Sequence, residues 1–152
     1  MKINAKLCAV VGVAGLLAAC SNGPKAADQS IAGSYVLVSL NDQSLPNSIP
    51  PVLNVTESSE VTKIDINGKM CNIFNGQAIY QNGVLQAANG VAMTRMYCSE
   101  TALNELDTLI GNMLASGAKV EKVDGKLILK SGNNTLVYQQ KELPMTHKDN
   151  TK

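Results

Sequence analysis

The sequence is poor in the side chains that most often recognise nucleic acids or quaternary ammonium groups. It has no Trp and a single Phe, and aromatic residues make up 3% of its 152 positions. These rings are too few to build stacking platforms for bases or aromatic cages. Lys and Arg number 13 against 12 Asp and Glu, so no basic excess is present to hold a phosphate backbone. We therefore expect no binding to nucleic acid.

Catalytic side-chain patterns are equally scarce. The one histidine, His147, lies in a polar tail expected at 144–152, so no imidazole is available to activate a serine within the folded domain. The sequence has no glycine-rich phosphate loop of the Walker or Rossmann type, and its carboxylates are scattered. The composition of 45% hydrophobic and 16% charged residues is nevertheless that of a chain with a core. We expect a folded protein that is not an enzyme and has no catalytic residues.

The N-terminal segment predicts export. Lys2 and Lys6 precede an apolar run at 7–17, which at about 11 residues is too short to span a bilayer as a helix. The run ends at Leu17-Ala18-Ala19-Cys20, which resembles the lipobox of bacterial lipoproteins. An ordinary signal peptide or a short anchor helix is the alternative.

The lipobox resemblance implies a lipid anchor. Residues 1–19 would be removed as a lipoprotein signal peptide, and Cys20 would carry acyl chains such as palmitate, the only cofactor expected. Ser21 follows Cys20, which by the pattern of enteric-type bacteria implies sorting to the outer membrane. Residues 20–30 then form the lipidated Cys and a flexible polar tether to a domain at 31–143 that lies in the periplasm.

Cys71 and Cys98 remain once Cys8 leaves with the signal and Cys20 is acylated. An even pair in an exported protein predicts a structural disulfide. It would close a loop of about 28 residues, which contributes about 3.5 kcal/mol in the chain-entropy model. Two free buried thiols or a redox pair are the alternatives, although the spacing is not that of a thioredoxin-like Cys-x-x-Cys motif.

Short strands separated by turn sequences dominate the mature chain. We expect strands within 31–40, 52–55, 61–66, 70–74, 77–80, 84–87, 119–123, 126–130 and 135–140. The turns between them are predicted at Asn67-Gly68, Asn75-Gly76, Asn82-Gly83 and Asp124-Gly125.

One segment has helical periodicity instead. An apolar face at helical spacing is formed by Leu103, Leu106, Ile110, Met113 and Leu114. Ser99 or Thr101 is expected to cap this helix, and Gly117 to end it. Many strands and one helix indicate an α+β fold, a small curved antiparallel sheet or cracked barrel with one packed helix.

Two motifs resemble those of the META domain family. The first is Met70-Cys71-Asn72-Ile73-Phe74-Asn75-Gly76, and the second is Met93-Thr94-Arg95-Met96-Tyr97-Cys98, followed by Asn104-Glu105-Leu106-Asp107. With the strands at 127–129 and 136–138, the resemblance extends from about residue 34 to 138. It implies a cracked barrel with one helix. Many members have Gly at Met70, Arg at Ile73, and a small residue or Met at Tyr97.

The motif residues Asn72, Phe74, Gly76, Thr94, Arg95 and Met96 are the candidate binding or structural residues. Asn72 and Asn75 are expected to form turns, and Phe74 to lie in the core. Arg95, the only arginine, is able to clamp a carboxylate or phosphate, but we favour a structural tie to backbone carbonyls or to a carboxylate.

A copper site is a weaker interpretation of the methionines. Met70, Met93 and Met96, with Met113, carry thioethers that suit Cu(I). Methionine fills irregular cores more often than it binds metal, so we expect no metal site.

By resemblance, the expected function is that of a stress-response lipoprotein. Family members are linked to heat-shock expression, envelope stress and novobiocin resistance. The expected partner is an unknown envelope protein or a small hydrophobic ligand. The alternative is a pilotin-like chaperone that takes an acyl chain or an amphipathic peptide in the barrel cleft.

Overall fold

The computed structural model describes residues 29–45, 50–60, 62–87 and 89–141. The expected signal peptide, the lipidated Cys20, most of the tether and the polar tail at 144–152 lie outside the described residues. The elements, in chain order, are β1 (Gly33–Leu40), β2 (Gln43–Ser44), β3 (Val52–Glu57), β4 (Lys63–Lys69), β5 (Ile73–Gln81), β6 (Val84–Gln86), β7 (Ala92–Met93), α1 (Thr101–Ser116), β8 (Ala118–Val123), β9 (Lys126–Ser131) and β10 (Asn134–Gln140).

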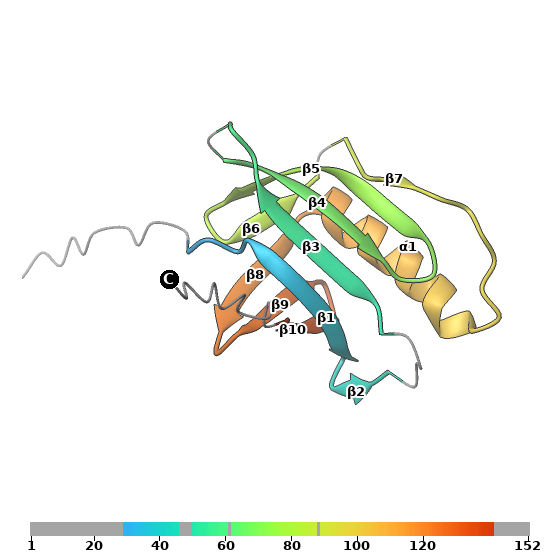
Figure 1. The fold of residues 1–152 in the computed structure, drawn as a ribbon. Helices are drawn as coiled ribbons and strands as arrows, with labels where there is room; N and C mark the ends of the chain where they lie inside the picture. Colours follow the sequence, from blue (N-terminus) through green and yellow to red (C-terminus); the bar gives the residue numbers. More distant parts are fainter. Residues whose placement is uncertain (1–28, 46–49, 61, 88, 142–152) are drawn as a thin grey trace, which may run out of the picture.

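Eight of these strands close into an antiparallel barrel (Figure 1). The order is β10-β9-β8-β6-β5-β4-β3-β1, and β1 pairs back to β10 from Tyr35 opposite Gln140 to Leu40 opposite Leu136. The two-residue strands β2 and β7 attach to β1 and β5. This arrangement confirms the α+β class. Closure pairs the barrel edges that an open sheet would leave exposed.

The seam between β6 and β8 is the shortest in the barrel, with Val84 opposite Lys119 and Leu85 opposite Ala118. The C-terminal part of α1 lies against this seam. The backbone N–H of Ala87 donates to the carbonyl of Leu114 at 2.8 Å, and the Gln86 amide donates to the carbonyl of Ala115 at 3.2 Å. The helix therefore completes the barrel where strand pairing is weakest.

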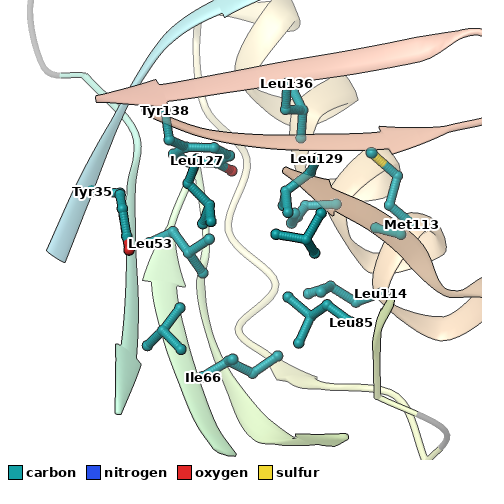
Figure 2. Packing of buried hydrophobic residues seen from close by; sticks show 14 of the residues in the cluster. Tyr35, Leu53, Ile66, Leu85, Met113, Leu114, Leu127, Leu129, Leu136 and Tyr138 are labelled. Atoms are coloured by element: carbon teal, nitrogen blue, oxygen red, sulfur yellow. The ribbon is translucent and has the colours of Figure 1, made fainter. Parts of the chain in front are cut away.

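Side chains from the strands and from α1 fill the interior (Figure 2). Alternate residues of each strand point inward, because side chains alternate between the two faces of a strand. The fully buried set includes Tyr35, Leu53, Phe74, Leu85, Ile110, Leu114, Leu127, Leu129, Leu136 and Tyr138. The predicted helix face and the core position of Phe74 are confirmed.

Two predicted turns are wrong. Asn67-Gly68 lies inside β4 and Asn75-Gly76 inside β5, while the chain reverses at Met70–Asn72. These glycines make room for neighbouring groups. A Cβ on Gly68 would lie 2.4 Å from the carbonyl oxygen of Val52 and 2.5 Å from the Phe74 ring. Asn75 is therefore an exposed strand residue and not a turn former.

The other two predicted turns are confirmed. Asn82-Gly83 and Asp124-Gly125 both have the positive φ values that such two-residue hairpin turns require. The predicted helix caps are only half right. Gly117 follows the helix with φ 93°, but the N-cap residue is Glu100, whose side chain makes no capping hydrogen bond.

The barrel has two distinct ends. At the proximal end, where β1 begins, Ile31 is buried and its carbonyl accepts a 2.7 Å hydrogen bond from the Tyr35 hydroxyl. Lys122 also donates to the carbonyl of Ser30 there, at 3.1 Å. At the distal end lie Leu40, the turn between β4 and β5, and the start of α1 (Figure 1). The described chain thus enters the domain at the proximal end, whereas the turn between β4 and β5 and the start of α1 lie at the distal end.

The two buried tyrosines predict opposite effects of removing a hydroxyl. The Tyr138 hydroxyl has no hydrogen-bond partner among the described residues, whereas that of Tyr35 donates to Ile31. Tyr35→Phe should lower the free energy of unfolding by about 1 kcal/mol, and Tyr138→Phe should leave it unchanged or raise it, since an unmade buried hydrogen bond costs stability. Urea denaturation at pH 7 measures both.

The same pair predicts sensitivity to alkali. Burial raises the pKa of Tyr35 and of Tyr138 above the ordinary value of 10.0. The folded state therefore retains protons that the unfolded state releases, so stability is complete below about pH 10 and falls above it. Tyr138→Phe should reduce this fall; a wild-type stability curve that stays flat to pH 11 would contradict the argument.

Candidate functional site

A buried polar cluster joins three segments at the distal end. Its centre is the pair Asn72 and Asp107, which are 6% and 7% exposed. Asn72 belongs to the turn between β4 and β5, and Asp107 to the second turn of α1. The third segment is the chain from Thr94 to Cys98, which leads from β7 to the helix. Buried polar groups of this kind are stable only when each is hydrogen-bonded.

The Asp107 carboxylate holds the turn through three N–H groups. Oδ1 accepts from the backbone N–H of Cys71 at 3.2 Å and of Asn72 at 3.0 Å. Oδ2 accepts from the Asn72 side-chain amide at 2.7 Å. Among the described residues no Lys or Arg forms an ion pair with this carboxylate. Charge-assisted hydrogen bonds from neutral donors therefore compensate for its burial.

The Asn72 side chain connects the turn to the Thr94–Cys98 segment. Its Oδ1 accepts from the Thr94 hydroxyl at 2.9 Å and from the Met96 N–H at 2.6 Å. Its amide group, besides its bond to Asp107, donates to the Met96 carbonyl at 3.0 Å. The amide thus pairs with Met96 as a neighbouring strand would. Asn72 lies in a turn as expected, but its side chain serves this distant contact.

A disulfide between Cys71 and Cys98 fastens the same two segments, with their Cα atoms 5.9 Å apart. Beyond it, the Asn104 side chain accepts from the Cys98 N–H at 3.2 Å and donates to the Cys98 carbonyl at 2.8 Å. The segment is therefore held at both ends. The predicted pairing is present, and its sulfurs supply no thiolate to a metal.

The other predicted site residues are dispersed. Gly76 accommodates Val91, whose Cγ1 would lie 3.2 Å from a Cβ at that position. Met70 and Met113 are core residues, Met93 is half-buried and the Met96 side chain is exposed. Within the described part of the chain, no three His, Cys, Asp or Glu side chains form a group that could hold a metal ion.

Arg95 is not the structural tie that we expected. Its side chain is exposed, and among the described residues it forms neither an ion pair nor a hydrogen bond. The residues on each side of it turn their backbone groups inward, which leaves Arg95 facing solvent. Its guanidinium is thus available to a ligand.

Sequence reasoning assigned no role to Asp107 or Asn104. A signal for Asp107 was available, since it lies four residues after Leu103 and three before Ile110, in the middle of the apolar helix face. An acidic residue at such a position needs buried donors, and these come from a turn 35 residues earlier. Asn104 carried no comparable signal.

A surface groove lies beside the cluster, between α1 and the distal ends of β1 and β10. Its volume is about 480 Å³. Apolar residues form most of its wall, and Glu105, Thr108, Asn112 and Asn134 lie around them; the apolar set is Leu40, Leu45, Ala102, Leu106 and Leu109. Grooves of this size and lining bind small apolar ligands in many proteins.

The closed antiparallel barrel, the helix α1 and the cross-linked polar cluster define a small α+β domain. The META domain matches residues 28–143, and the chain belongs to the META domain family. It is 37% identical over 142 residues to "Heat shock protein HslJ" of Escherichia coli (strain K12), covering 91% of this chain and 97% of that protein.

A solved NMR structure is also similar. It has a TM-score of 0.62 and 38% sequence identity, and the match covers 71% of this chain and 88% of the other. These findings confirm the resemblance inferred from the two motifs. Across the described residues, no helix is long and apolar enough to cross a membrane.

The cluster predicts a large effect from one isosteric change. Asp107→Asn would replace one of the two carboxylate oxygens, which together accept three N–H groups, with an N–H₂ group that cannot accept. We expect a loss of about 3 kcal/mol in the free energy of unfolding. Asp65→Asn is the matched control, because Asp65 is exposed and, among the described residues, accepts a side-chain hydrogen bond only from Gln77. Chemical denaturation measures both; equal losses would contradict a special role for Asp107.

Proposed function

We propose that this protein is a non-enzymatic lipoprotein of the outer membrane whose META domain acts in the periplasm. It would contribute to the response to heat and envelope stress, including novobiocin tolerance, by binding a partner. The heat-shock name of the HslJ relative supports the stress role. The lipobox-like Leu17-Ala18-Ala19-Cys20 supports the anchor.

The observation that carries the binding role is the separation of the two barrel ends. The chain enters at Ser30, and the groove, the polar cluster and the exposed Arg95 all belong to the distal end. A chain from Cys20 to Ser30 reaches at most about 35 Å. An anchor at Cys20 would hold the proximal end nearer the membrane, which leaves the distal end facing the periplasm and accessible to partners.

The anchor predicts a clear phenotype for Cys20→Ser. Without the thiol, no lipid can be attached, so the protein should lose palmitate labelling and leave the outer-membrane fraction. In a strain that lacks the chromosomal gene, this variant should fail to restore survival with novobiocin or after heat shock. Its thermal melting should match that of the wild type, because the barrel begins only at Gly33.

Two results would contradict the proposal separately. A wild-type protein that carries no lipid and whose signal-peptide processing is unaffected by globomycin would contradict the proposed lipid anchor. Unchanged heat and novobiocin survival in the deletion strain would remove the stress role.

The groove favours a second function, that of a pilotin-like chaperone. Because core side chains fill the barrel interior, an acyl chain or an amphipathic peptide would bind in the groove beside α1 rather than within the barrel. Half-buried Leu40, Leu45 and Leu109 would contact its apolar part.

This function predicts a retained ligand. Native mass spectra of the protein extracted from its membrane should show a bound lipid, and Leu109→Asp should lose it, because a charge in the groove disfavours apolar contact. Val123→Asp, on an exposed valine of β8 outside the groove, is the control. Spectra without any ligand, together with no peptide bound, would contradict the chaperone function.

A further inference from the structure

The backbone of Thr94–Cys98 is hydrogen-bonded in the alternating way of a β-strand. On the side that faces the domain, however, its partners are mostly side chains rather than a neighbouring strand. The Thr94 N–H donates to the carbonyl of Ile73 at 3.0 Å. The N–H and carbonyl of Met96 both bond to the Asn72 amide, and those of Cys98 both bond to the Asn104 amide. Every second residue is therefore bonded on its inner side, Thr94 through its N–H and Met96 and Cys98 through both backbone groups.

The residues between them face the other way. Among the described residues, no hydrogen bond reaches the backbone N–H or carbonyl of Arg95 or Tyr97. In a strand, backbone groups alternate in direction, so these two residues present a free edge with two donors and two acceptors. We call residues 94–98 the free edge.

The side chains along the free edge are unusually exposed. Tyr97 is 86% and Met96 60% exposed, and Ile73, which bonds to Thr94, is 52% exposed. Two cations accompany them, because the exposed Lys69 is the register partner of Ile73 and Arg95 has no acidic partner among the described residues. The surface thus combines apolar side chains with unpaired positive charge.

The free edge is also held in place before any ligand arrives. The Asn72 amide restrains it at Thr94 and Met96, and the disulfide and the Asn104 amide both restrain it at Cys98. Exposed edges in natural proteins are normally covered or bulged, because they pair readily with other chains. An edge fixed in advance binds at a lower entropic cost than one that must be ordered.

We propose that the free edge binds an extended peptide segment of a partner protein by strand addition, with an Asp or Glu of the peptide against Arg95. Backbone hydrogen bonds to Arg95 and Tyr97 would supply affinity, and the acidic side chain would supply selectivity. This inference deepens the proposed function and rests on it, since it names the surface by which the domain recognises a protein partner.

The charge is what selects this occupant. A second copy of the chain would place Arg95 opposite Tyr97 and would bring two positive edges together. An acidic extended segment instead neutralises Arg95 and Lys69.

The test uses the full chain in detergent and a fluorescent acetylated peptide, Thr-Val-Glu-Val-Thr, followed by anisotropy. Replacing the peptide Glu with Lys should weaken binding by roughly tenfold, and Arg95→Glu should reverse that preference. Hydrogen exchange of the Arg95 and Tyr97 amides should be fast in the free protein and slow with the peptide bound.

Proline substitution isolates the backbone contribution. Tyr97→Pro and Tyr97→Ala both remove the ring, but only Pro removes the outward N–H, so Tyr97→Pro should bind roughly 3- to 10-fold more weakly than Tyr97→Ala. Neither variant breaks an internal hydrogen bond, so both should melt together. Val123→Ala serves as a control for loss of an exposed apolar side chain far from the edge.

Peptides that are N-methylated at alternate positions provide a check that leaves the protein unchanged. Methylation of the peptide N–H groups that face the domain should abolish binding, whereas methylation of those that face away should not, because an added strand uses only one of its edges. Binding that is indifferent to methylation and to Tyr97→Pro would overturn the proposal, as would no binding at all. Sedimentation that shows a dimer broken by Tyr97→Pro would assign the edge to a second copy instead.

These outcomes are separate from those of the proposed function. The peptide assay depends on neither Cys20 nor cell survival, so a negative result removes the free edge as the binding surface and leaves the stress role standing. A negative result in cells removes the stress role while peptide binding remains measurable.

Discussion

The Asp107 carboxylate is the group on which the distal half of the structure depends. It is a buried charge on the apolar face of α1, and its three N–H donors come from one turn between β4 and β5. Helix and turn therefore fix each other: the helix cannot move away without leaving a charge unsatisfied, and the turn cannot open without losing its acceptor. Asn72, held by Asp107, then positions the Thr94–Cys98 segment.

The disulfide and the amide network restrain the same region by different means. The Cys71–Cys98 bond constrains the unfolded chain as well as the folded one, while the hydrogen bonds act only in the folded state. Together they hold a segment with little regular secondary structure of its own. The consequence is that the restrained segment presents exposed side chains and backbone groups at a fixed place. A flexible loop would have to be ordered on binding.

Core side chains fill the barrel interior. Barrels with large interiors enclose ligands, but here Tyr35, Leu127 and Tyr138 are part of a packed core and have no exposed area (Figure 2). The recognition that we propose would then use the groove beside α1 or the free edge, both at the distal end. The opposite end is occupied by the incoming chain at Ser30 and Ile31. The lipid anchor that we propose on that side and the binding surface that we propose on the other are compatible with each other.

Much of the fold was predictable from the sequence because it rests on local patterns. Alternating strands, the helix face and the turns at Asn82-Gly83 and Asp124-Gly125 are determined by side chains close together in the chain. The predicted turns at Asn67-Gly68 and Asn75-Gly76 were wrong, because those glycines leave room for groups that come close only in the folded structure. These groups are the Phe74 ring at Gly68 and Val91 at Gly76. A glycine that makes room for a distant group has the same local signature as one that forms a turn.

For the candidate site, too, some features followed from the sequence and others only from the tertiary structure. The sequence by itself determined the likeness to the META family, the pairing expected of two cysteines and the choice of Asn72, Thr94 and Met96 as candidate residues. Only the tertiary structure decided what these residues do. Asn72 bonds to residues 24 and 35 positions away, and Arg95 forms no ion pair with any described residue. Hydrogen bonds between distant segments depend on how the barrel closes, and that closure cannot be inferred from the pattern of neighbouring residues in the chain.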